Sequence, residues 1–178
     1  MGRAEPASNV LAILGVVSRC REAFDWTRHT TTSSWGNIAL ESDRFDFTET
    51  DYYEATMGKG LKKQFFAYEN LIDPADLADI KRQTDTWEQE FAQTDDFDVA
   101  RPLNLDPGYI TLGKLVLAST KDHSHRIYLR DGIYAEVTLH FRKRAWQKSP
   151  WTYPDYQRSD FQAFFSKCRD YLKAHTSD

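Results

Sequence analysis

The chain has 178 residues, of which 40% are hydrophobic, 14% aromatic and 28% charged. Residues 1–178 are long enough for one domain with a single core, and the aromatic content argues against intrinsic disorder. A formal charge of −4 excludes nucleic-acid binding by bulk positive charge, and two cysteines without a Cys-x-x-Cys spacing argue against a disulfide framework or a zinc site. A reducing, cytoplasmic location fits this cysteine usage best.

The N-terminal segment divides into a tail and a strand. Residues 1–9 have no periodicity and are predicted to form a flexible tail. Val10–Val17 is almost continuously apolar, which predicts an interior strand covered on both faces. This run is too short to cross a bilayer and no Ala-x-Ala site follows it, so neither a membrane anchor nor a secretory signal is favoured.

The next segment alternates short helices and strands. The pattern predicts a helix over Cys20–His29, a polar loop over Thr30–Ser34 and a strand over Ile38–Phe47. A short capped helix follows through Met57, and Leu61–Tyr68 is rich in the aromatic residues that favour strands.

Two longer amphipathic helices are predicted. Asp73 and Pro74 match an N-cap followed by proline in the first turn, and a second helix begins near Ser159. The apolar stripe of the first helix comprises Leu77, Ile80, Thr84, Trp87 and Phe91, and that of the second comprises Phe161, Phe164, Phe165, Cys168 and Leu172. The predicted fold is α+β, with an antiparallel or mixed sheet of five or six strands and both helices packed on one face.

The region over residues 109–142 is rich in strand signals, and Asp131-Gly132 predicts a hairpin within it. A two-residue loop would set charge against apolar surface on both faces, whereas a three-residue loop over Arg130–Gly132 avoids this. We therefore predict the longer loop, with Gly132 in the left-handed conformation. Its cross-strand pairs are Leu129 with Ile133, Tyr128 with Tyr134, Ile127 with Ala135 and Arg126 with Glu136.

Two glycine-containing motifs precede this hairpin. Gly108 to Lys114 matches the GxxxxGK pattern of a P-loop, but Leu115 follows in place of Ser or Thr and a strand follows in place of a helix. The motif is therefore interpreted as two glycines at a strand start. Asn104–Tyr109 is interpreted first as a turn, because Asp106 precedes Pro-Gly. In the alternative interpretation, Asp106 holds a functional carboxylate at the mouth of the sheet.

Basic residues gather just before the hairpin. Lys121, His125 and Arg126 are predicted to bind a phosphate or carboxylate, with Tyr128 beside them. A solvated loop with a single Arg126–Glu136 bridge is an equally weighted alternative. His123 and His125 lack the helix-fixed spacing of a strong metal motif, so no metal site is assigned.

Acidic residues supply the candidates for catalysis. Glu136 interrupts a strand that otherwise looks buried and needs a partner there, so Glu136 and Asp106 are the acid–base candidates. The aromatic segment Trp151–Tyr156 either fills the core or lines a pocket, and in the second case Asp155 and Tyr156 would face a ligand.

Six segments together resemble the uncharacterised bacterial family called domain of unknown function 4416. They are Tyr52–Glu54 with Met57–Gly58, Asn104–Tyr109, Lys114–Lys121, His125–Leu129, Gly132–Leu139 and Thr152–Tyr156. The resemblance covers nearly the whole chain and implies a shared fold and site location without implying a reaction.

The leading functional hypothesis is a protein that binds, or an enzyme that acts on, a phosphorylated or nucleotide-like small anion. A non-catalytic interaction module and a divalent-metal hydrolase are the alternatives. No cofactor and no oligomeric state are assigned from the sequence.

Overall fold

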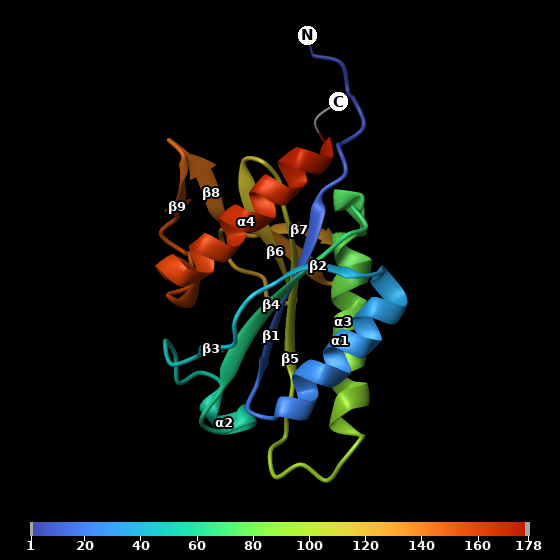
Figure 1. Cartoon of the computed structure of the whole chain (residues 1–178), viewed down its shortest axis with the longest axis vertical. Helices are drawn as coiled ribbons and strands as arrows, with labels where there is room; N and C mark the ends of the chain where they lie inside the picture. The colour runs from blue at the N-terminus through green and yellow to red at the C-terminus, as the bar shows by residue number, and fades with distance from the viewer. Residues whose placement is uncertain (1, 177–178) are drawn as a thin grey trace.

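The computed structural model describes residues 2–176, which form one antiparallel sheet flanked by helices (Figure 1). The strands are β1 (Leu11–Ser18), β2 (Ile38–Glu41), β3 (Phe45–Asp46), β4 (Lys62–Tyr68), β5 (Asn104–Ile110), β6 (Lys114–Ser119), β7 (Ile127–Arg130), β8 (Ile133–Arg142) and β9 (Ala145–Lys148). The α-helices are α1 (Arg21–Trp35), α2 (Glu54–Met57), α3 (Leu77–Ala92) and α4 (Ser159–Thr176), and the 3₁₀ helices are η1 (Pro74–Asp76) and η2 (Asp155–Gln157).

The sheet has nine strands in these residues, so the prediction of five or six was too low. Its order is β2-β4-β1-β5-β6-β8-β7, with β3 also paired to β4 and β9 to β8. Two of the extra strands, β3 and β9, are pieces of four residues or fewer, which apolar periodicity does not resolve, and a third, β5, lies in the segment that was interpreted as a turn. The predicted strand Ile38–Phe47 is likewise divided into β2 and β3.

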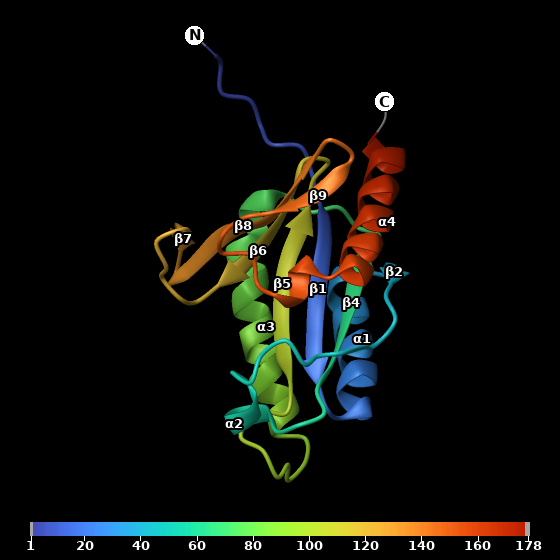
Figure 2. The same cartoon turned by 90° about the vertical axis from the view of Figure 1, so that its left-hand side faces the viewer.

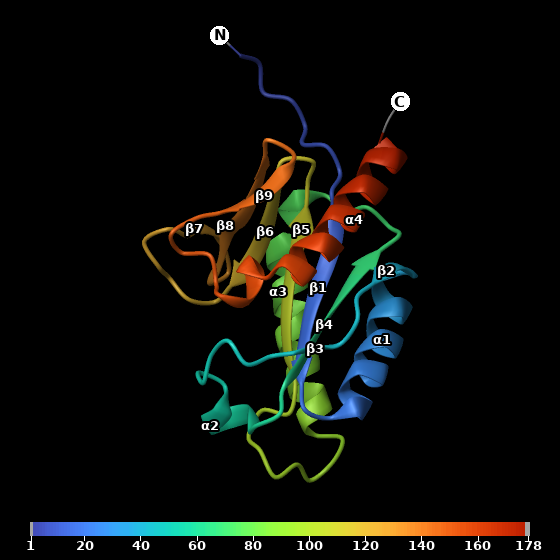
Figure 3. The same cartoon turned by 60° about the vertical axis from the view of Figure 1, so that its left-hand side comes forward.

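Strand β1 occupies the interior position predicted for it. All of its residues are buried, and it pairs with β4 on one side and β5 on the other. Residues 2–9 are exposed and extend away from the sheet (Figure 3). None of the helices in residues 2–176 is long and apolar enough to cross a membrane.

The two main amphipathic helices lie on opposite faces of the sheet, which corrects the prediction that they share one. Helix α4 packs with Leu11, Ile13 and Phe65, whereas α3 packs with α1 on Leu14, Val16 and their neighbours. Figure 1 shows α4 on one side of β1 and β5 and the other two helices on the opposite side. Because successive side chains of β1 point to opposite faces and all are apolar, each face needs its own cover.

Helix α1 continues through the segment predicted to be a polar loop, so that prediction was wrong. The hydroxyl of Thr27 donates to the carbonyl of Ala23 at 2.7 Å, and that of Thr31 donates to the carbonyl of Thr27 at 2.8 Å. These bonds along the helix satisfy both buried hydroxyls without leaving helical geometry. The predicted N-cap at Asp73 is confirmed for η1, the 3₁₀ turn that leads into α3, because the Asp73 carboxylate accepts the Ala75 amide at 2.8 Å.

The β7–β8 hairpin combines the two geometries considered above. Asp131 and Gly132 have φ values of 53° and 77°, as in a two-residue turn of type I′, and Arg130 pairs with Ile133. The predicted Leu129–Ile133 pair is therefore wrong. A bulge between Tyr128 and Arg130 then shifts the register by one residue, so the predicted pairs Tyr128–Tyr134 and Ile127–Ala135 are confirmed. Figure 2 shows this hairpin at the margin of the sheet.

Asn104–Tyr109 forms most of strand β5, which overturns its interpretation as a turn. The β5–β6 pairing covers only Gly108 to Ile110, so Pro107, which lacks an amide donor, lies just outside that ladder. Gly108 follows where the two strands approach closely. The GxxxxGK segment thus joins two antiparallel strands, with no helix to receive phosphates.

We expect Gly108→Ala to lower the free energy of unfolding by about 2 kcal/mol or more. A Cβ atom at this position would lie 2.2 Å from the Val116 carbonyl oxygen, so the backbone would have to move. Gly113→Ala is the matched control, because a Cβ there meets nothing within 4 Å and should change stability by under about 0.5 kcal/mol. Urea denaturation of both variants measures the difference, and equal midpoints would contradict this account of β5.

Candidate functional site

The candidate site lies where the sheet splits. On the N-terminal side of Gly108, β5 no longer pairs with β6. There, side chains of α3 form the hydrogen bonds to the β5 backbone that a neighbouring strand would otherwise form. The backbone amide of Leu105 donates to Glu88 at 2.7 Å, and the Leu105 carbonyl accepts from Lys81 at 3.0 Å. The split therefore leaves no unsatisfied backbone group at Leu105, and it opens a space between β5 and the ends of β6 and β8.

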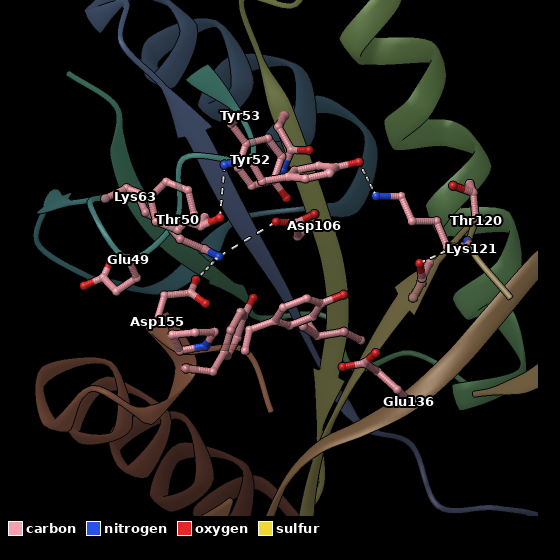
Figure 4. A pocket seen from close by; sticks show the side chains of 18 of the residues that line it. Glu49, Thr50, Tyr52, Tyr53, Lys63, Asp106, Thr120, Lys121, Glu136 and Asp155 are labelled. Atoms are coloured by element: carbon pink, nitrogen blue, oxygen red, sulfur yellow. Dashed lines mark hydrogen bonds and ion pairs between the residues drawn. The ribbon is translucent and has the colours of Figure 1, made fainter. Parts of the chain in front are cut away.

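A cavity of about 430 Å³ fills this space (Figure 4). Its lining comes from the sheet, the segment before α2, the loop after β6 and the segment around η2. The polar lining residues include Glu49, Thr50, Tyr52, Tyr53, Lys63, Lys81, Arg101, Asn104, Asp106, Ser119, Thr120, Lys121, His123, Glu136, Tyr153, Asp155 and Tyr156. A volume of this size lies in the usual range of small-molecule sites, roughly 300–1,000 Å³.

Buried Lys63 occupies the floor of the cavity. Its ammonium donates to the Asp155 carboxylate at 2.7 Å and lies 3.8 Å from the carboxylate of Asp106. It also lies 4.4 Å from the centre of the Tyr156 ring. Burial acts to lower the pKa of Lys63, but Asp155 and Asp106 outweigh burial and raise it above its ordinary value, so the lysine stays charged.

The sheet register explains why these groups meet. Lys63 pairs with Val17, and Asp106 pairs with Gly15, so the side chains of Lys63 and Asp106 emerge on the same face as α4. A Cβ atom at Gly15 would lie 3.4 Å from the Lys63 chain and 3.5 Å from the Tyr156 hydroxyl. Glycine at position 15 therefore leaves room for the lysine and the phenol above β1.

Arg126 and Glu136 form a second buried pair beside the cavity. The Nε atom of Arg126 donates to Glu136 at 2.8 Å, which confirms the predicted meeting of these side chains on one face. The guanidinium also donates to the Ser119 hydroxyl at 2.7 Å, to the Lys121 carbonyl at 2.9 Å and to the Tyr153 hydroxyl. Most donors of Arg126 are thus already used by the protein.

Glu136 lines the cavity, and its carboxylate oxygens have several partners. Besides Arg126, the carboxylate contacts His125 Nε2 at 3.2 Å and accepts the Thr138 hydroxyl at 3.1 Å. The ring of His125 stacks on Trp151, with centroids 5.2 Å apart. This network holds the loop before β7 against β8 and leaves Glu136 little free acceptor capacity.

The mouth of the cavity is bridged by Lys121 and Tyr52, two side chains that lie 69 positions apart in the chain. The lysine ammonium donates to the Tyr52 hydroxyl at 2.6 Å and lies 4.4 Å from the ring centre, as Figure 4 shows. This hydrogen bond and the positive charge lower the pKa of Tyr52. Near the opposite wall, Arg101 donates to Glu88 and to the side-chain oxygen of Asn104.

The structure brings most of the sequence-predicted residues to one place. Glu136, Asp106, Lys121, Asp155 and Tyr156 line the cavity. His125 and Arg126 lie behind Glu136 and contact it. Tyr128 does not reach the cavity, because it lies on edge strand β7 against Tyr134 and is 57% exposed.

Several lining residues were missed from the sequence. Lys63 alternates with Phe65 and Ala67, which pack on the α4 face of β4, so a lysine within this apolar strand was a readable signal. Tyr53, Arg101 and Asn104 carry no such signal, because contacts distant in sequence place them. Among residues 2–176, no three His, Cys, Asp or Glu side chains gather as a candidate metal-ligand set.

The family described as Domain of unknown function (DUF4416) matches residues 8–171 of the chain. No curated protein and no solved structure matches the chain.

We expect Lys63→Met to lower the free energy of unfolding by about 3–5 kcal/mol, because it leaves Asp155 and Asp106 without their buried counter-charge. Lys62→Met is the matched control: Lys62 has a 45% exposed side chain paired with Asp46, and its loss should cost under about 1 kcal/mol. Urea denaturation at neutral pH compares them, and similar midpoints would contradict a structural role for the buried pair.

The same pair predicts a dependence on pH. Because the pKa of Lys63 is raised in the folded chain, its stabilising contribution is complete below its ordinary pKa of 10.5 and is lost as the pH rises beyond it. The stability difference between the wild type and Lys63→Met should therefore narrow only above pH 10.5. Denaturation at a series of alkaline pH values measures this, and a difference that vanishes near neutral pH would contradict it.

Proposed function

The chain belongs to the family described as domain of unknown function 4416, whose description assigns no activity. We propose from the geometry of the cavity that the protein binds a small molecule carrying a phosphate or a similar anionic group. This refines the hypothesis of a phosphorylated or nucleotide-like ligand drawn from the sequence.

The observation that carries the proposal is that the ammonium of Lys121 has no carboxylate partner in the part of the chain that the structure describes. The lysine and arginine side chains of the lining are Lys63, Lys81, Arg101 and Lys121. The first three each pair with a carboxylate, at 2.7 Å to Asp155, 2.8 Å to Asp85 and 2.8 Å to Glu88 respectively. Within the described chain, the ammonium of Lys121 has only the hydroxyl of Tyr52 as its hydrogen-bond partner, and no carboxylate pairs with it. A cation at a cavity mouth without a counter-charge favours an anionic ligand.

The walls fit a ligand larger than a bare ion. Aromatic side chains of Phe47, Tyr53 and Tyr153 contribute apolar surface next to the charged groups. Small-molecule sites commonly combine apolar walls with a few polar groups that fix orientation. This combination favours an organic phosphate over inorganic phosphate alone.

If the cavity also supports a reaction, Asp106 is the better acid–base candidate. Its carboxylate lines the cavity and has Lys63 at 3.8 Å as its nearest basic partner. Glu136 is engaged by Arg126, His125 and Thr138, so we assign it a positioning role instead. The metal-hydrolase alternative gains no ligand set from the residues described.

The non-catalytic alternative rests on one specific observation. Arg126, predicted to bind an anion, has a side chain only 2% exposed, and its guanidinium donates hydrogen bonds to protein groups. In that alternative the buried pairs only hold the sheet together, and no small ligand stabilises the fold.

We expect a screen of organic phosphates and nucleotides to raise the melting temperature of the wild-type chain. A ligand at a hundred times its Kd adds about 2.7 kcal/mol, which for a chain of this size raises Tm by roughly 5–10 °C. Lys121→Ala should lower the affinity for that ligand about tenfold or more, because a charge-assisted hydrogen bond to the anion is lost. Lys114→Ala, at the exposed start of β6, is the matched control and should bind as the wild type does.

Two outcomes would contradict the proposal. One is that no phosphate compound stabilises the chain while Arg126→Ala, which removes the partner of buried Glu136, severely destabilises it; that pair of results supports the structural module. The other is that Lys121→Ala and Lys114→Ala weaken a ligand equally, which would place the anion outside this cavity.

A further inference from the structure

We propose that the floor of this cavity recognises hydroxyl groups, so that the ligand is a phosphate ester of a sugar or another polyol. This inference rests on the proposed function and concerns the end of the ligand opposite its anion. The residues that carry it are Asn104, Asp106 and Tyr156.

Two buried polar atoms in the cavity lining have no protein partner in the described chain. They are the amide nitrogen of Asn104 and the hydroxyl of Tyr156, in residues that are each 2% exposed. The side-chain oxygen of Asn104 accepts from Arg101, which fixes its amide so that the nitrogen remains as a donor. Buried polar atoms are rarely left unpaired, and the described chain has two others, the Tyr68 hydroxyl and the Trp146 indole nitrogen, in residues that do not line the cavity. Lack of a partner and position at the cavity together make Asn104 and Tyr156 the atoms available to a bound group.

Asp106 provides the complementary acceptor. It lies two residues after Asn104 in β5, and side chains at this spacing emerge on the same face of a strand. Its closest cation is Lys63, at 3.8 Å, which is too long for a hydrogen bond. The floor thus presents a carboxylate acceptor together with an amide donor and a phenol.

Tyrosines around the carboxylate remain neutral. Burial and the nearby charge of Asp106 raise the pKa of Tyr156, and the charge of Asp106 together with burial raises that of Tyr53. Both phenols therefore keep their protons at neutral pH, and each is able to donate or accept one hydrogen bond.

A hydroxyl group is the ligand group that suits this set. It donates to a carboxylate and at the same time accepts from an amide or phenol, whereas an alkyl group satisfies neither and an ammonium satisfies only the acceptor. Sites that hydrogen-bond a ligand hydroxyl discriminate strongly against the analogue that lacks it, because their buried polar groups are then left unpaired.

Charge fixes which end of the ligand reaches the floor. Lys63 is shared between the carboxylates of Asp155 and Asp106, so this group of three carries a net negative charge. A second anion at the floor would be repelled, while the ammonium of Lys121 stands at the mouth. In Figure 4 the labelled Asp106 and Asp155 lie together near Lys63, whereas Lys121 reaches the cavity from the β6 side. The phosphate is thereby directed to Lys121 and the hydroxyl groups to Asp106.

The test compares matched phosphate esters by calorimetry and thermal shift. The probes are a pentose phosphate, its deoxy analogue, glycerol phosphate, ethyl phosphate and inorganic phosphate. We expect the pentose phosphate to bind the wild type at least about tenfold more tightly than ethyl phosphate. Tyr156→Phe should remove most of this preference by lowering affinity for the pentose phosphate more than affinity for ethyl phosphate, because it deletes only the hydroxyl. Asp106→Asn should act in the same direction.

Tyr68→Phe is the matched control. Tyr68 is a fully buried tyrosine on the opposite face of the sheet, so its phenol lies away from the cavity. If the pentose phosphate and ethyl phosphate bind equally well, the hydroxyl inference is wrong while anion binding stands. If Tyr156→Phe and Tyr68→Phe change the preference equally, the recognition does not occur at this floor. If no phosphate ester binds at all, the proposed function fails first and takes this inference with it.

Discussion

The ammonium group of Lys63 is the charge around which the cavity is organised. An unpaired ammonium in a protein interior costs several kcal/mol, so a stable fold has to bring carboxylates to it. Asp155 does so from η2 and Asp106 from β5, at 2.7 Å and 3.8 Å. The contact with Asp155 fixes the 3₁₀ helix against the sheet and places Tyr156 beside β1. Meeting the electrostatic demand of one lysine therefore also builds the floor of the site.

Much of the fold was readable from the sequence because local patterns determine it. The continuous apolar run of β1 indicated an interior strand, and charge pairing across the hairpin indicated the register that joins Arg126 to Glu136. Which face each helix covers was not readable, since an amphipathic stripe is the same on either side of a sheet. The apolar character of both β1 faces did contain the information that two covers were needed, and the prediction of one covered face conflicted with it.

The site was readable only in part, for a physical reason. Polar residues that interrupt apolar strands, such as Glu136, stand out because burial without a partner is unfavourable. Asp106 was selected as a carboxylate at the mouth of the sheet, yet its segment was interpreted first as a turn, because Asp-Pro-Gly favours turns locally. Pairing with β1 overrides that preference. Asn104 and Tyr53 gain their positions from contacts that no short window of sequence contains.

The spacing of the site's contacts along the chain has a consequence for how the protein folds. The hydrogen bond from Lys63 to Asp155 joins residues 92 positions apart, and that from Lys121 to Tyr52 spans 69. Contacts between such distant segments form slowly, because a long stretch of chain must be ordered before they are gained. The cavity is therefore expected to be among the last regions to assemble after synthesis. A chain synthesised only as far as β9 would lack Asp155 and Tyr156, and therefore a complete cavity lining.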